Sequence, residues 1–367
     1  MAVSRINEAG LNVNQYGNRN LIINGEFQIF QRATAATAQT DGNFLTADRW
    51  FGFVSGGGAY TTQKSTGNTG TISHDTAWKI DVTTADTSLA AGDYYSLVQK
   101  IEAQNLQQLA YGTSNAKTIT LSFWVRATKT GTSCVCVTKN DTTQYNYVAE
   151  YTINASDTWE HKTITIEPNS DIKAASGAIV NDNGLGMQVT FVLAYGSNYT
   201  AGVNNTWNDS ADFATTNQIN HMDSTSNDFY LTGVQLEVGD TATDFEHRSF
   251  GDELARCQRY YFRIDADESY KRYANGVYYS TTAAETMIYL PVTMRAEPSF
   301  ENTGTSTDYA FYDGTVRSIS SNLALNAASY AGTMVISGTT SATTLGNGAI
   351  FLSNNNTNSF IAASAEL

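Results

Sequence analysis

The chain has 367 residues, of which 41% are hydrophobic and 11% aromatic, so we expect a folded protein with room for two ordinary domains. Its formal net charge of −14 argues against nucleic acid or an anionic membrane as a partner, because binding to either requires clustered lysine and arginine. Only 15% of the residues are charged, and threonine, serine, asparagine and glutamine supply the remaining polar share. This mixture favours strands joined by polar turns.

No stretch approaches the roughly 18 apolar residues of a membrane-spanning helix, and no apolar core of signal-peptide length follows the N-terminus. The three cysteines, Cys134, Cys136 and Cys257, have no spacing that indicates a disulfide framework. We therefore expect synthesis in a reducing cytoplasm and no insertion into a membrane.

Residues 1–19 are polar and rich in asparagine, which is typical of a segment that orders only against a partner. We interpret them as an N-terminal attachment segment. From residue 20 to 248, apolar and polar residues alternate repeatedly, as they do over residues 119–126 and 187–193. Clusters of Gly, Asn and Asp separate these runs, and no helical period lies between them. The pattern predicts an all-β fold in which residues 20–248 form a jelly-roll β-sandwich.

One segment breaks the rhythm of the strands. Ser249 is a candidate N-cap, and Leu254, Cys257 and Tyr261 recur at helical spacing, which predicts a short helix over residues 250–262. A helix of this length needs a packing partner, either within the chain or in another copy of it. We expect residues 249–262 to form a short helical neck or linker. Short strands return in residues 263–367, which predicts a smaller C-terminal β-sandwich domain.

The sequence contains no pattern that indicates catalysis or metal binding. The four histidines, His74, His161, His221 and His247, lie far from one another in the sequence and have none of the short spacings of a zinc site. Phosphate-binding glycine loops and nucleophile elbows are also absent from the sequence. We therefore expect no enzyme activity, no metal and no cofactor. A pair of carboxylates for glycoside hydrolysis stays open, since its members can lie far apart in the chain.

Aromatic residues in polar loops give the most informative functional signal. A sugar packs its C–H face on an aromatic ring, and neighbouring Asn, Asp and Thr bind its hydroxyl groups. We predict possible glycan contacts in the first domain and receptor contacts in the second; the alternative is that these rings fill the rims of the sandwiches. The first set is Tyr195, Tyr199 and Trp207, and the second set is Tyr309, Tyr312 and Tyr330.

Four motifs in a fixed order also resemble tail fibre and virion structural proteins of tailed bacteriophages, especially short-tailed phages of marine bacteria. The motifs are Asn20–Arg32 (NLIINGEFQIFQR) followed by Asp48–Trp50, then Phe229–Gly239 (FYLTGVQLEVG) followed by Ala242–Glu246, then Glu253–Tyr261 (ELARCQRYY), and finally Leu290–Pro298 (LPVTMRAEP). The resemblance covers roughly residues 20–300.

The resemblance implies a tail fibre in the virion, made in the host cytoplasm. Such fibres are usually homotrimers, so Leu254, Cys257 and Tyr261 would form an oligomeric neck. Residues 1–19 would attach to a tail or adaptor protein, and the tip would bind a surface glycan or an outer-membrane receptor of the host. Two alternatives stay open: a capsid decoration or tail adaptor without a receptor, and a polysaccharide depolymerase.

The Asn20–Arg32 and Phe229–Gly239 motifs also resemble the opening and closing strands of carbohydrate-binding modules with a jelly-roll fold. Those modules often hold a structural calcium ion near the Gly-Glu-Phe stretch, with an acidic pair in the closing strand. Glu26 matches this pattern, but Thr232 and Gly233 stand where the acidic pair would be. The sequence therefore argues against a calcium site.

Overall fold

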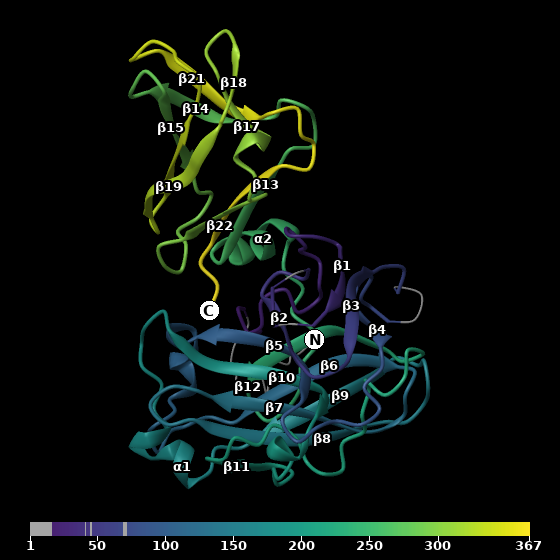
Figure 1. Ribbon diagram of the computed structural model, residues 1–367. Helices are drawn as coiled ribbons and strands as arrows, with labels where there is room; N and C mark the ends of the chain where they lie inside the picture. Colours follow the sequence, from purple (N-terminus) through teal and green to yellow (C-terminus); the bar gives the residue numbers. More distant parts are fainter. Residues whose placement is uncertain (1–16, 41, 45, 69–71) are drawn as a thin grey trace, which may run out of the picture. The chain divides into compact units, whose positions relative to one another are not determined.

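Antiparallel strands form almost all of the regular structure in the computed structural model of the protein (Figure 1), which confirms the all-β prediction. The structure describes residues 17–367 apart from 41, 45 and 69–71. The chain divides into a first unit, Met1–Phe250 with Leu367, and a second unit, Gly251–Glu366. Residues 1–16, most of the expected attachment segment, lie outside the described residues. Among the described residues, no helix combines the length and the apolarity needed to cross a bilayer.

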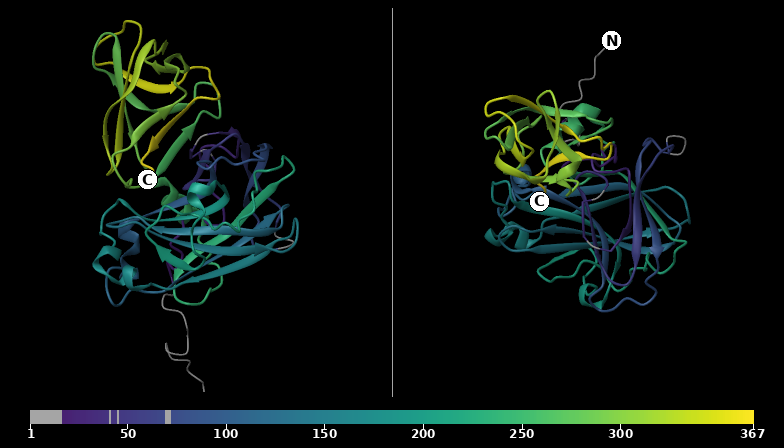
Figure 2. Two further views of the ribbon diagram at one scale, coloured as in Figure 1. Left: turned by 60° about the horizontal axis from the view of Figure 1, so that its bottom comes forward. Right: turned by 45° about the horizontal axis from the view of Figure 1, so that its top comes forward.

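The first unit is a sandwich of two six-stranded sheets, whose layers can be followed in Figures 1 and 2. The first sheet has the order β1 (Ala35–Gln39), β3 (Ala59–Ser65), β4 (Ala77–Thr84), β12 (Asp228–Val238), β6 (Ile119–Ala127) and β9 (Glu160–Ile166). The second sheet has the order β11 (Thr206–Asn208), β8 (Tyr145–Ile153), β7 (Gly131–Lys139), β10 (Leu185–Tyr195), β5 (Tyr94–Glu102) and β2 (Trp50–Ser55). Short helical turns occupy the connections: η2 (Ala103–Leu109), α1 (Ser170–Lys173), η3 (Ala175–Gly177) and η4 (Ser197–Tyr199).

Aromatic rings link the two sheets of the first unit through its core. Phe123 of β6 and Phe191 of β10 meet edge to face, with ring centroids 4.9 Å apart. Phe27 packs against Trp50 of β2 at 5.0 Å and against Trp78 of β4 at 5.7 Å. All five rings are at most 2% exposed. The alternation of apolar and polar residues that predicted these strands arises because every second side chain faces this core.

The opening segment, residues 19–31, covers this core without forming a strand. Backbone hydrogen bonds join it to β12, from Leu21 N–H to Leu236 O at 2.8 Å and from Val234 N–H to Gly25 O at 2.9 Å, and side-chain amides supplement them. Asn20 Nδ2 donates to Val234 O at 3.0 Å, while Asn20 Oδ1 accepts from the backbone N–H of Ile22 at 2.9 Å and of Leu236 at 3.1 Å. Asn20 is 5% exposed, so one buried side chain joins the opening segment to the closing strand β12.

The side chain of Asn24 also bonds to backbone groups, most of them within the opening segment. Its Oδ1 accepts from the N–H groups of Gln28 and Ile29 at 2.9 and 3.0 Å, and its Nδ2 donates to the carbonyls of Ile29 and Asp48 at 2.9 and 3.0 Å. Its backbone φ of 57° lies in the left-handed region, which asparagine tolerates better than most residues. Asn24 thereby fixes the tight turn that places Glu26 and Phe27.

The two ends of the first unit meet at one carboxylate. Glu246 accepts from the N–H groups of Arg19 and Asn20 at 3.1 and 3.0 Å and from Arg248 at 3.1 Å. Burial raises the pKa of Glu246, but these donors together hold it below its ordinary value. Residues 19–20 and 246–248, near the two ends of the described part of the first unit, therefore lie side by side.

The second unit contains two sheets that share one hydrophobic core. One sheet has the order β13 (Tyr261–Asp265), β22 (Phe360–Ser364) and β16 (Ser299–Asn302). The other has the order β18 (Val316–Ser318), β17 (Tyr309–Tyr312), β21 (Gly348–Ser353), β14 (Arg272–Tyr278), β15 (Ala283–Tyr289), β20 (Thr333–Thr339) and β19 (Ser321–Ser329). A single turn, η5 (Ser306–Asp308), precedes β17.

The predicted neck helix is shorter than expected, since α2 covers Phe250–Gln258. Tyr261 belongs to β13 instead of the helix, which corrects its place in the predicted stripe. Cys257 and Tyr261 are 0% and 1% exposed in the single chain, whereas Leu254 is half-buried. Of the three predicted neck residues, Leu254 is therefore the one with enough exposed side-chain surface to contact another copy of the chain.

We predict that Asn24→Ala lowers the free energy of unfolding of the first unit by about 3 kcal/mol or more, because several buried backbone groups lose their partner. All five tryptophans lie in this unit, so their fluorescence during denaturation measures its unfolding. Asn205→Ala is the matched control, since Asn205 also has a left-handed φ of 57° but is exposed. A loss as small as that of Asn205→Ala would contradict the role given to Asn24.

Candidate functional site

The outer face of the second sheet carries a row of aromatic and small polar side chains. Strands β10, β5 and β2 lie side by side there, and their register sets the rows. Thr190 stands beside Val98, and the next row places Ser96 beside Phe53. Because successive side chains alternate between faces, these residues point away from the core.

A β-bulge adds Tyr195 to this outer face. Val192 points outward beside Ser96, so regular alternation would turn Tyr195 toward the core. The register shifts between Val192 and Ala194, and Tyr195 then pairs with Tyr94. An extra residue in a strand re-aims the side chains that follow it, and here it places two tyrosines side by side outside the sandwich.

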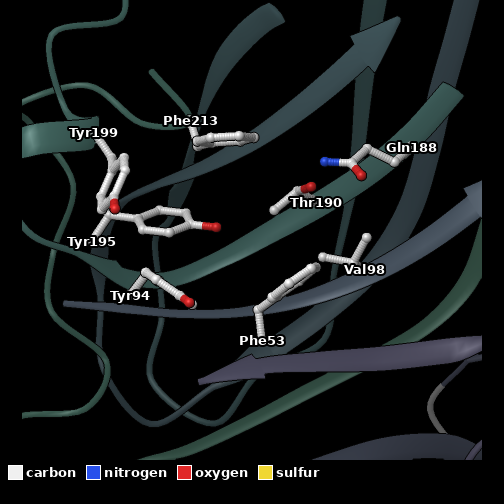
Figure 3. A pocket seen from close by; sticks show the side chains of 8 residues that line it. All are labelled: Phe53, Tyr94, Val98, Gln188, Thr190, Tyr195, Tyr199 and Phe213. Atoms are coloured by element: carbon white, nitrogen blue, oxygen red, sulfur yellow. The ribbon is translucent and has the colours of Figure 1, made fainter. Parts of the chain in front are cut away.

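These side chains form a shallow pocket of about 140 Å³ (Figure 3). Figure 3 shows the rings of Tyr94, Tyr195, Tyr199 and Phe213 gathered on one side and Phe53 below Thr190. The complete lining is Phe53, Tyr94, Val98, Gln188, Thr190, Tyr195, Tyr199 and Phe213. Tyr199 comes from η4 and Phe213 from the loop that follows β11; the N–H of Phe213 donates to Tyr199 O at 2.9 Å.

Tyr195 is the central ring of this group. Its centroid lies 6.0 Å from that of Tyr94 and 5.7 Å from those of Tyr199 and Phe213. Its hydroxyl lies 3.0 Å from Ser96 Oγ. Burial raises the pKa of Tyr195, an effect that the bond with Ser96 only partly offsets. The phenol is therefore neutral near pH 7, where it can donate as well as accept a hydrogen bond.

The floor of the pocket holds a polar atom without a partner. Thr190 is 1% exposed, and its Oγ1 has no hydrogen bond within the described residues. Burying a hydroxyl in this way costs free energy, so an unpaired one in a native site calls for an explanation. Thr190 thus brings an unused hydrogen-bonding group to the lining of the pocket.

The pocket combines the two features that a sugar ring requires: flat aromatic surface and a hydroxyl at its floor. Its volume is below the roughly 300–1,000 Å³ of pockets that enclose a whole drug-sized ligand. It therefore suits one ring of a longer ligand.

Of the predicted glycan contacts in the first unit, the structure brings Tyr195 and Tyr199 together and leaves Trp207 apart. Trp207 is 5% exposed, its Nε1 donates to Glu167 O at 2.9 Å, and its ring packs on Tyr147 at 5.3 Å. It borders a separate, more polar hollow of about 520 Å³. The structure therefore separates Trp207 from the two tyrosines, since its indole closes one edge of the core, and a glycan contact at Trp207 stays a prediction.

In the second unit, Tyr309 also corrects a prediction. It is fully buried, its ring stacks on Phe351 at 5.8 Å, and its hydroxyl donates to Phe360 O at 2.5 Å. Tyr312 and Tyr330 are 36% and 56% exposed. They lie on different elements, Tyr312 at the end of β17 and Tyr330 in the turn between β19 and β20. Both stay predicted receptor contacts.

Sequence reasoning missed Phe53, Tyr94 and Phe213, which complete the pocket. In β2, WFGFVS, Phe53 is three positions after Trp50, and side chains an odd number of positions apart lie on opposite faces of a strand. The sequence could therefore have placed Phe53 on the outer face. Nothing in the sequence marks Phe213 as a neighbour of Tyr195, because a loop carries it there.

The fold also unites residues that the sequence separates widely. Glu26 lies between His74 and His247, with oxygen-to-Nδ1 distances of 3.1 and 3.2 Å. Burial raises the pKa of Glu26, but the two histidines together hold it below its ordinary value. Among the described residues these three form a group that could hold a metal ion. The sequence spacings gave no sign of it.

No protein-family model matches the sequence, and no curated protein matches it. Several solved structures are similar to it, with low scores. The enzymatically active domain of tailspike protein 4 of bacteriophage CBA120 has 11% identity and a TM-score of 0.28 over 60% of this chain and 21% of its own length. A family 11 carbohydrate-binding module of a Clostridium thermocellum cellulase has 13% identity and a TM-score of 0.28 over 59% and 98%. A family 4 carbohydrate-binding module has 17% identity and a TM-score of 0.29 over 59% and 97%.

The chain thus spans about a fifth of the tailspike domain. All three TM-scores lie below 0.5, so we base neither the fold nor the function on these likenesses. The fold rests on the strand order, and the site rests on its side chains.

We predict that Thr190→Val leaves the stability of the first unit unchanged or raises it by about 1 kcal/mol, because it removes a buried hydroxyl that lacks a partner. Thr62→Val is the matched control on the first sheet. Thr62 is buried and accepts a hydrogen bond from Thr46 Oγ1 at 3.0 Å, so its loss lowers stability by about 1 kcal/mol. Denaturation followed by tryptophan fluorescence compares the two variants; equal losses would contradict the unpaired state of Thr190.

Proposed function

We propose that this chain is a tail fibre of a bacteriophage particle that binds a host-surface glycan without cleaving it. The observation that carries the glycan part is the pocket on the outer face of the second sheet. Its rings offer surface for the C–H face of a sugar, and Thr190 Oγ1 offers an unused hydrogen bond.

The particle part of the proposal rests on the four ordered sequence motifs. Two of them have a clear structural basis, since Asn20–Arg32 forms the opening segment and Phe229–Gly239 forms most of β12, to which Asn20 bonds. These two motifs therefore form the contact between the opening segment and strand β12. The homotrimer also belongs to the proposal, and three linked pockets would multiply a weak glycan affinity.

A glycan that stacks in this pocket should bind less tightly when the rings are removed. We predict that Tyr199→Ala and Phe213→Ala each weaken binding of the full-length chain to host-surface polysaccharide at least tenfold, or about 1.4 kcal/mol. Both residues are half-buried surface rings, so the fold should persist. Calorimetric titration measures the affinity.

Tyr330→Ala tests the competing contact, because Tyr330 is an exposed predicted receptor contact of the second unit, and Tyr289→Ala, at an exposed tyrosine outside both predicted sets, serves as the control. A loss of binding in Tyr330→Ala with none in Tyr199→Ala would move the contact to the second unit and overturn the pocket. Shortened polysaccharide chains after incubation with the protein would show a depolymerase instead of a binding protein.

The location of the chain is tested on whole phage particles, and its oligomeric state is tested on the pure protein. Antibody labelling of whole particles in the electron microscope should place the chain on the tail, and label over the capsid shell would favour a decoration protein. The mass in solution should be close to three times 39.8 kDa; a mass of one chain would contradict the trimer.

A further inference from the structure

We propose that the first unit binds a divalent transition-metal ion of the zinc type between Glu26, His74 and His247. The three residues come from the opening segment, the loop before β4 and the segment after β12. Each offers one ligand atom, and these atoms all lie within 4.8 Å of one another. The site is separate from the aromatic pocket and does not depend on glycan binding.

The spacing of the donor atoms fits direct coordination. A tetrahedral zinc ion with bonds of about 2.0–2.1 Å separates two neighbouring ligand atoms by about 3.3 Å. Glu26 Oε1 lies 3.1 Å from His74 Nδ1, and the other carboxylate oxygen, Glu26 Oε2, lies 3.2 Å from His247 Nδ1. Each imidazole ring directs its Nδ1 atom at the carboxylate of Glu26. A metal ion can therefore replace the protons of these two hydrogen bonds with small movements of the side chains.

The carboxylate of Glu26 is already held in position by other groups. Gln28 Nε2 donates to Glu26 Oε2 at 2.6 Å, and the hydroxyl of Thr76 donates to the backbone oxygen of Glu26 at 2.6 Å. Outer contacts of this kind orient metal ligands and reduce the cost of ordering them. Phe245 packs edge-on against both imidazole rings, with centroids 4.9 Å from His74 and 5.0 Å from His247.

The backbone of β12 leaves room for the ring of His74. Gly233 has a φ of 58°, and a Cβ there would lie 2.6 Å from His74 Nε2. A side chain at Gly233 would therefore displace a ring that is itself 1% exposed. Gly233 stands where the resembling modules would have an acidic calcium ligand. Because it has no side chain, it leaves space for the ring of His74.

The donor set selects the class of ion. Calcium takes six to eight oxygen ligands, whereas two imidazole nitrogens with one carboxylate are typical of zinc and related ions. His247 is 53% exposed at its side chain, which provides a path for entry and leaves a coordination position for water. An ion there would join the opening segment to the segment that leaves the first unit.

The test is calorimetric titration of the untagged full-length chain, stripped with chelator, with Zn²⁺ and separately with Ca²⁺. We expect one Zn²⁺ per chain, a higher thermal midpoint with the ion bound, and no binding of Ca²⁺. Co²⁺ in place of Zn²⁺ should give the visible absorption of a low-symmetry site. His247→Ala should weaken Zn²⁺ binding at least tenfold and reduce the thermal shift, and its exposed side chain makes loss of the fold unexpected.

Glu26→Gln provides a second variant that keeps the size of the side chain. His161→Ala is the matched control, because His161 is an exposed histidine that packs on Trp124 and lies outside the group. It should bind Zn²⁺ as the unaltered chain does. The proposal fails if the unaltered chain takes up no Zn²⁺, if His247→Ala and Glu26→Gln bind it with unchanged affinity, or if Ca²⁺ binds equally well.

Discussion

The first unit depends on two buried asparagine side chains that, together with backbone bonds to β12, hold the opening segment over the core. The opening segment covers the core between the sheets without forming a strand, and Asn20 and Asn24 satisfy backbone groups that its bonds to β12 leave over. These amides bond to β12 and to the segment's own turn. Phe27 then reaches Trp50 and Trp78, and Glu26 reaches the two histidines.

The outer face of the second sheet depends on a different local irregularity. Regular strands would keep Tyr195 in the core, where a phenol would need a buried partner. The bulge in β10 places it on the outer face beside Tyr94, where its hydroxyl and that of Ser96 share a hydrogen bond. The aromatic pocket therefore exists because one strand departs from regular pairing, as is common next to functional sites.

The sequence was informative wherever side chains alternate regularly. The apolar series of β6 predicted both the strand and its inward face, because period-2 burial leaves a direct trace in the residue order. The helix α2 was also foreseen, although it ends at Gln258, and its continuation was mistaken because Tyr261 starts a strand. Local patterns thus gave the elements and their class.

The candidate sites depended on information that residue order does not carry. The face on which Tyr195 lies depends on a bulge. Trp207 and Tyr199 look alike in the sequence, although Trp207 is buried against the core and Tyr199 lines the aromatic pocket. Tyr309 looked like a tip residue because polar residues surround it, but its ring fills the core of the second unit. His74 and His247 are 173 positions apart, and only the path of the opening segment brings Glu26 between them.

The meeting of residues 19 and 246 at one carboxylate has a consequence for how this unit can be used. A domain whose ends lie together can be placed within a loop of an unrelated protein without stretching the host chain. The bonds from Arg19 and Asn20 to Glu246 would close the unit at the point of insertion. Residues 19–246 therefore have end positions that would suit insertion into a loop of another protein, with the outer-face pocket left unchanged.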